Sequence, residues 1–126
     1  MKTQEKDQLI LESVNCLREL QKETVNLNFN HNSGVYFEIN KEIVSCIKFL
    51  DECVIYSLYN EGKCKICMQL CLQQLEILNS YCKLHVCYFP SGEEVNKRLE
   101  KLWDSSYNKI KQLYVVCFKE EWKRVH

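Results

Sequence analysis

Helix-breaking residues are confined to four positions in this chain of 126 residues. Its only glycines and its only proline are Gly34, Gly62, Pro90 and Gly92. Glycine breaks helices through its backbone freedom, and proline through its fixed φ and its missing N–H. Because neither residue occurs elsewhere, the pattern predicts four long helices joined by three short connections.

Apolar residues recur in these stretches at the spacing of one helix face. The second stretch carries Ile43, Ile47, Leu50, Val54 and Leu58 at intervals of three and four residues. In the third stretch the expected core row is Ile66, Leu70, Gln74, Ile77 and Tyr81, flanked by Cys67, Cys71, Leu75 and Leu78. A period of this kind is the main sequence signal of an amphipathic helix.

Capping signals indicate where the helices begin. Asn40 is a suitable N-cap for the second helix, and Ser91 opens a capping box that Glu94 completes. We expect helices at about residues 3–27, 41–60, 63–87 and 92–123. Long helices with short links pack as antiparallel neighbours. We therefore predict an all-α protein, a single-domain four-helix up-down-up-down bundle over residues 1–126.

The composition is that of an ordinary folded protein, with 46% hydrophobic and 27% charged residues. The formal net charge is zero, which argues against nucleic acid as a partner because nucleic-acid-binding proteins carry a basic excess. No apolar run approaches the ~20 residues that span a bilayer, so no membrane association is expected. Residues 1–7 are polar and include acids, unlike a signal peptide. We expect an intracellular protein of the cytoplasm or nucleus, or a secreted one if a signal peptide has been removed.

Nine cysteines are the strongest oddity of the composition. They are Cys16, Cys46, Cys53, Cys64, Cys67, Cys71, Cys82, Cys87 and Cys117. Most of them fall on or beside the apolar rows, and a free cysteine behaves as a small buried hydrophobe. The odd count does not favour a complete disulfide framework. We expect most of these thiols to be reduced, buried and free of metal.

A zinc-like spacing is present on paper, with Cys64 and Cys67 followed by Cys82 and His85. Tetrahedral zinc needs all its ligand atoms within about 2.0–2.3 Å of the ion. If one helix carries all four residues, the stretch from Cys67 to Cys82 spans ~22 Å and the two halves cannot meet. We therefore expect no metal and no cofactor. These four residues remain ligand candidates only if that helix breaks near Asn79 and Ser80, or if Cys64 and Cys67 recruit ligands from another helix, such as Cys53 or His31.

Motifs for catalysis are missing from the sequence. It contains no glycine-rich phosphate loop, no Walker pattern and no HExxH. A nucleophilic pair of Cys82 or Cys87 with His85 lacks the third group that would orient it. We expect the protein not to be an enzyme.

The last helix carries a second apolar row beside its core row. The second row consists of Trp103, Tyr107, Tyr114, Phe118 and Trp122. Together the two rows are wider than the ~100° stripe that one bundle face needs. Either this helix is the most buried of the four, or the aromatic row binds a partner or a second copy, since Trp and Tyr dominate interface hot spots. On the second interpretation we expect Trp122 to be the most exposed of the row.

These observations favour a non-enzymatic helical-bundle module that binds another protein, as an adaptor or a complex subunit. The chain has no alanine and few arginines, which indicates an AT-rich gene and makes a viral host-modulating protein one form of this hypothesis. A secreted four-helix cytokine-like ligand is an alternative. A cysteine-based metal-binding or redox protein is another.

Overall fold

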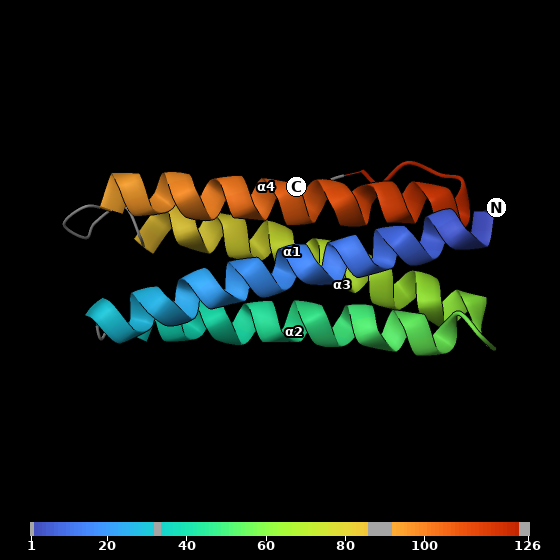
Figure 1. Ribbon diagram of the computed structural model, residues 1–126, viewed down its shortest axis with the longest axis horizontal. Helices are drawn as coiled ribbons and strands as arrows, with labels where there is room; N and C mark the ends of the chain where they lie inside the picture. Colours follow the sequence, from blue (N-terminus) through green and yellow to red (C-terminus); the bar gives the residue numbers. More distant parts are fainter. Residues whose placement is uncertain (1, 32–33, 86–91, 124–126) are drawn as a thin grey trace.

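The computed structural model describes residues 2–31, 34–85 and 92–123, and within them every regular element is an α-helix. The helices are α1 (Lys2–His31), α2 (Gly34–Tyr56), α3 (Glu61–His85) and α4 (Gly92–Phe118). They lie side by side and alternate in direction (Figure 1). The predicted all-α four-helix bundle is confirmed. Across the described ranges, no helix combines the length and apolarity that crossing a bilayer requires.

Each helix packs against two others, as in an up-down-up-down bundle. α1 contacts α2 and α4, and α3 contacts the same two helices from the opposite side. In Figure 1, α1 crosses in front of α3, with α4 above and α2 below. The core therefore lies on the bundle axis and receives side chains from all four helices.

The second helix begins earlier than its sequence indicates. It starts at Gly34, so Asn40 lies inside the helix and is not its N-cap. The earlier start buries Tyr36 and Ile39, which continue the buried row of Ile43 toward the N-terminus. Burial of two large apolar side chains outweighs the local preference of an asparagine for a cap. The predicted capping box of α4 cannot be assessed, because Ser91 lies outside the described residues.

The remaining helix ends also differ from those expected. α1 continues to His31, while α2 stops at Tyr56. α3 begins at Glu61 because Asn60 caps it, its Oδ1 accepting the Lys63 N–H at 3.1 Å. α4 stops at Phe118 instead of residue 123, since Lys119 adopts a left-handed φ of 53° that ends a helix.

The third helix buries a different face from the predicted one. Ile66, Leu70 and Ile77 are exposed, so the predicted core row of this helix is wrong. The buried face is Cys64, Cys67, Met68, Cys71, Leu72, Leu75, Leu78 and Cys82. The two rows are both apolar, and the row with small thiols is the one that lets α3 approach α2 closely.

The cysteines take the buried positions that were expected of them. Eight fall within the described residues, where they are free thiols, and six of these are buried. Cys87 lies outside the described residues. Cys46 and Cys71 face each other across α2 and α3, each sulfur lying near the other residue's carbonyl oxygen at 3.9 and 3.4 Å.

Two leucines on α3 test which face of this helix is buried. Leu72 is 0% exposed and Leu70 is 39% exposed. Leu72→Ala should lower the free energy of unfolding by ~2–5 kcal/mol, because it leaves a core cavity. Leu70→Ala should lower it by less than ~1 kcal/mol. Urea denaturation followed by circular dichroism measures both, and the reverse order would mean that α3 packs through its other face.

Candidate functional site

The aromatic row of α4 points into the bundle and packs on α3. Trp103, Tyr107 and Tyr114 are buried, and Phe118 is half-buried. The indole N–H of Trp103 donates to the carbonyl of Leu75 on α3 at 2.5 Å. The Trp103 and Tyr107 rings stack with centroids 4.7 Å apart. Within the fold, these side chains bind the protein's own third helix.

Residues 119–123, which we call the C-terminal strap, turn back along α4 after Lys119 (Figure 1). The strap brings Trp122 onto the bundle, where it is 9% exposed. Its ring meets that of Tyr114 edge-on, with centroids 5.7 Å apart. The expectation that Trp122 is the most exposed of the row is therefore wrong, because the chain reversal returns it to the bundle.

A carboxylate on α3 holds the strap in place. Glu76 Oε2 accepts the Trp122 indole N–H at 2.8 Å and the Tyr107 hydroxyl at 2.8 Å. The same indole N–H lies 3.0 Å from the Tyr107 oxygen. Nothing in the sequence connects Glu76 with a tryptophan 46 residues further along the chain, so sequence reasoning missed this contact.

A second group of contacts, closer to the start of the strap, also holds it against the bundle. Tyr114 donates its hydroxyl to Glu120 and accepts a hydrogen bond from Gln69 Nε2 at 3.1 Å. Lys65 on α3 pairs with Glu120 at 2.9 Å. The Tyr114 hydroxyl, followed by Lys65, holds the pKa of Glu120 below its usual value. The fold itself therefore engages all of the aromatic row, and binding of a partner by this row stays a prediction.

The zinc-like residues do not come together. α3 is continuous from Glu61 to His85, which keeps Cys67 and Cys82 ~22 Å apart. The side chain of His85 lies outside the described part. Among the described residues, no three histidine, cysteine or acidic side chains are grouped as metal ligands would be. Cys64 instead lies against Cys53 of α2, a pairing that spacing along the chain does not reveal.

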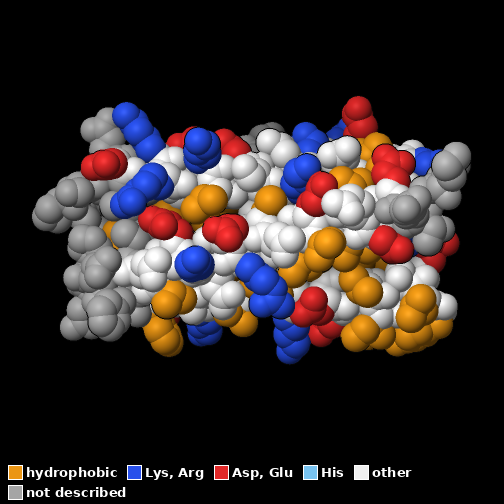
Figure 2. Space-filling view, viewed as in Figure 1, with side chains coloured by type: hydrophobic (Ala, Val, Ile, Leu, Met, Phe, Trp, Pro, Cys, Tyr) orange, Lys and Arg blue, Asp and Glu red, His pale blue; other side chains and the backbone are white. Residues whose placement is uncertain are grey.

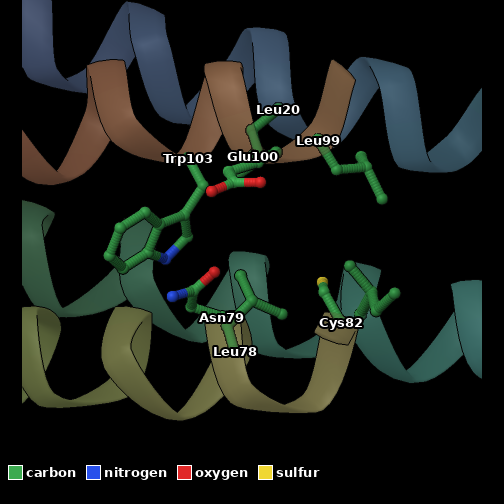
Figure 3. A pocket seen from close by; sticks show the side chains of 8 residues that line it. Leu20, Leu78, Asn79, Cys82, Leu99, Glu100 and Trp103 are labelled. Carbon is green, nitrogen blue, oxygen red and sulfur yellow. The ribbon is translucent and has the colours of Figure 1, made fainter. Parts of the chain in front are cut away.

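A small cavity lies where the four helices meet (Figure 3). Its volume is about 10 Å³, and its walls include Leu20 from α1, Ile39 from α2, Cys82 from α3 and Trp103 from α4. This volume holds about one water molecule, whereas ligand pockets measure ~300–1,000 Å³. The cavity is therefore a packing void and not a substrate site.

An exposed apolar patch lies where α2 ends. The patch, called here the corner patch, consists of Val54, Ile55, Leu58 and Tyr59. Leu58 and Tyr59 are 85% and 69% exposed. In Figure 2, hydrophobic side chains gather at the lower right, where Figure 1 places the end of α2. The sequence assigned Val54 and Leu58 to the core row, which is wrong. The buried face of α2 continues from Leu50 to Cys53 and leaves Val54 exposed, while Leu58 lies beyond the end of the helix at Tyr56.

Comparison with models of protein families, with curated proteins and with solved structures finds no match to this chain.

The burial of Trp122 yields a prediction for the stability of the protein. Trp122→Ala should lower the free energy of unfolding by ~3–5 kcal/mol, because it removes a buried aromatic ring. Trp122→Phe should cost ~1.5–3 kcal/mol, since it mainly removes the N–H that Glu76 accepts. Urea denaturation measures both changes.

Tyr59 provides the matched control for the strap. Tyr59→Ala removes an exposed aromatic ring and should change stability by ~0.5 kcal/mol or less. Equal effects of Trp122→Ala and Tyr59→Ala would show that the strap contributes nothing to folding.

Proposed function

We propose that this protein is a non-enzymatic, intracellular helical-bundle module that binds another protein, as an adaptor or a complex subunit. The corner patch is the observation that carries the proposal. Four apolar side chains within six consecutive residues are exposed there, two of them by more than two thirds. Exposed apolar groups that cluster, unlike those scattered singly, are typical of interaction sites.

The surroundings of the patch fit a protein interface. Exposed charged residues of both signs lie close to it along the chain. Asp51 and Glu61 are acidic, and Lys63 is basic. The Lys63 ammonium lies 5.4 Å from the centre of the Tyr56 ring, and Tyr56 in turn packs edge-on against Tyr59. An apolar centre with a polar rim is the usual anatomy of a protein–protein interface.

Two ionisable groups with shifted pKa values contribute to the packing of the helices. The pKa of Glu12 is lowered by its hydrogen bond to Lys109, at 2.9 Å between α1 and α4. The pKa of Cys82 is raised to about 12 by burial, which keeps this thiol protonated. Glu12 thus joins two helices and Cys82 fills the core.

The last helix remains a second route to association. A partner or second copy that used Trp103, Tyr107, Tyr114, Phe118 and Trp122 would first have to displace the C-terminal strap. The corner patch needs no such rearrangement, and this is why we favour it. The absence of alanine indicates an AT-rich gene. If that gene is viral, the partner is a host protein.

Leu58→Glu tests the proposal with little risk to the fold, because the side chain is 85% exposed. We expect the variant to keep the Tm of the wild type and to lose its partner. The tagged wild-type chain is used for capture from its native source, the captured protein is identified by mass spectrometry, and binding is repeated with purified components. A central interface residue of this kind should weaken binding by at least ~10-fold.

Ile77→Glu is the matched control, since Ile77 is an exposed aliphatic residue on α3 away from the corner. It should bind like the wild type. Sedimentation of wild type and Leu58→Glu alone shows whether the partner is a second copy. Equal affinity of Leu58→Glu and wild type for the purified partner would contradict the proposal.

A further inference from the structure

Two thiols meet at the corner between α2 and α3. The sulfur atoms of Cys53 and Cys64 are 3.0 Å apart, about 1 Å longer than a disulfide bond. Cys53 lies in the last turn of α2 and Cys64 in the first turn of α3. Both residues are 2% exposed. A small movement of either side chain would bring the sulfurs to bonding distance.

The two thiols lie at opposite ends of helix dipoles. The start of α3 favours an anion at Cys64, and the end of α2 disfavours one at Cys53. A hydrogen bond from the Cys53 thiol lowers the pKa of Cys64 to about 7, and the same bond raises the pKa of Cys53. Cys64 is therefore the nucleophile of the pair, because thiolates and not thiols attack oxidants.

Cys46 and Cys71 provide a contrast within the same helix interface. Their sulfurs lie near carbonyl oxygens of the opposite helix, which can accept a hydrogen bond but cannot donate one. The pKa of Cys71 is raised well above the usual value by its hydrogen bond to Cys46 and by burial. Cys71 is therefore held as a thiol, while Cys53 and Cys64 are arranged for exchange.

We propose that Cys53 and Cys64 are a redox modification site, at which a hydroperoxide converts the dithiol to a reversible disulfide. The Cys64 thiolate attacks the hydroperoxide, so that an S–O bond forms and the O–O bond breaks. The leaving alkoxide or hydroxide takes up a proton. Cys53 sulfur then attacks Cys64 sulfur, the S–S bond forms, and hydroxide leaves and takes the Cys53 proton as water. The two sulfurs supply the two electrons that reduce the hydroperoxide, and an external thiol such as glutathione reverses the reaction.

An open hollow lies beside this corner. Its volume is about 510 Å³, and Gly62, Lys65 and Cys117 are among the residues that line it. Gly62 and Lys65 lie close to Cys64 along the first turn of α3. The sulfurs of Cys53 and Cys64 lie beneath this surface, since both residues are 2% exposed.

The disulfide also bears on the corner patch. Residues 54–63 would be closed into a loop, and all four patch residues lie in it. Oxidation thus fixes the segment that presents the patch, and this consequence rests on the proposed function. The modification itself does not, since it needs only the two cysteines.

The test uses the purified full chain, first reduced and then treated with hydrogen peroxide. Remaining thiols are alkylated, and the digest is searched by mass spectrometry for a peptide pair linked through Cys53 and Cys64. We expect this link in the folded protein and its loss after reduction. No link, or a mixture in which Cys64 pairs equally with Cys67, would overturn the proposal.

Variants separate the roles of the two sulfurs. Cys53→Ser should leave Cys64 as a sulfenic acid that dimedone traps, whereas Cys64→Ser should leave Cys53 unoxidised. Cys46→Ser is the control and should keep the Cys53–Cys64 link. Circular dichroism checks that each variant is folded. If a variant does not fold, the Cys53–Cys64 link found by mass spectrometry in the wild type still tests the proposal. Sulfenic acid on Cys53 in the Cys64→Ser variant would contradict the assignment of Cys64 as nucleophile.

The pH dependence of oxidation gives an independent readout. Charged and titratable groups around Cys64 are Lys6 from α1, Cys53 from α2, Glu61 on its own helix and Cys117 from α4. As pH rises toward about 7 the thiolate fraction of Cys64 grows, so the oxidation rate should rise ~10-fold per pH unit and then level off. A rate that keeps rising to the ordinary pKa of cysteine would exclude a thiolate favoured by Cys53.

The Leu58→Glu variant keeps the two proposals distinguishable. It should form the disulfide as readily as the wild type, because Leu58 takes no part in the sulfur chemistry. Failure to form the disulfide in wild type would remove this inference and leave partner binding at the corner patch intact. If the wild type forms the disulfide but binds no partner through the corner patch, the proposed function is removed and this inference stays intact.

Discussion

Close packing of α2 on α3 through small thiols is the contact on which the rest of the bundle depends. The chain has no alanine, so other small residues must occupy the places where helices approach one another. Cysteines do this between α2 and α3, with Cys46 against Cys71 and Cys53 against Cys64. In α1, the small buried residues include Ser13. Its hydroxyl donates to the carbonyl of Leu9, so this buried donor is paired.

The choice of this thiol-lined face sets the orientation of α3 and, through it, the position of the C-terminal strap. With its cysteines turned toward the core, α3 leaves Ile77 exposed and presents Glu76 to α4. Glu76 then accepts hydrogen bonds from both Tyr107 and Trp122. A rotation of α3 that buried Ile77 would remove the acceptor that the strap needs. The burial of a tryptophan beyond the end of α4 is thus a consequence of how α2 and α3 pack.

The sequence was enough to predict four helices and their antiparallel order, because each of the three glycines lies in the first turn of a helix and none lies further inside one. It was not enough to choose between two apolar rows on α3, since both satisfy the helical period and the choice depends on the shape of α2. The burial of Trp122 could not be predicted from the sequence either. The chain reverses at Lys119, which adopts a left-handed φ although it is not a glycine. The pairing of Cys53 with Cys64 also depends on how two helix ends meet, which local spacing does not encode.

The corner between α2 and α3 joins the exposed patch and the thiol pair through one geometric cause. Asn60 caps α3 and also accepts the amide of Cys64 through its carbonyl at 3.0 Å, so α2 has to end before Asn60. The few residues left to connect the helices, Leu58 and Tyr59 among them, are too short a segment to fold back and bury their side chains. The same short connection sets the end of one helix beside the start of the next, which favours a thiol at Cys53 and a thiolate at Cys64. A longer connection between these helices would relax both constraints together, hiding the patch and separating the sulfurs.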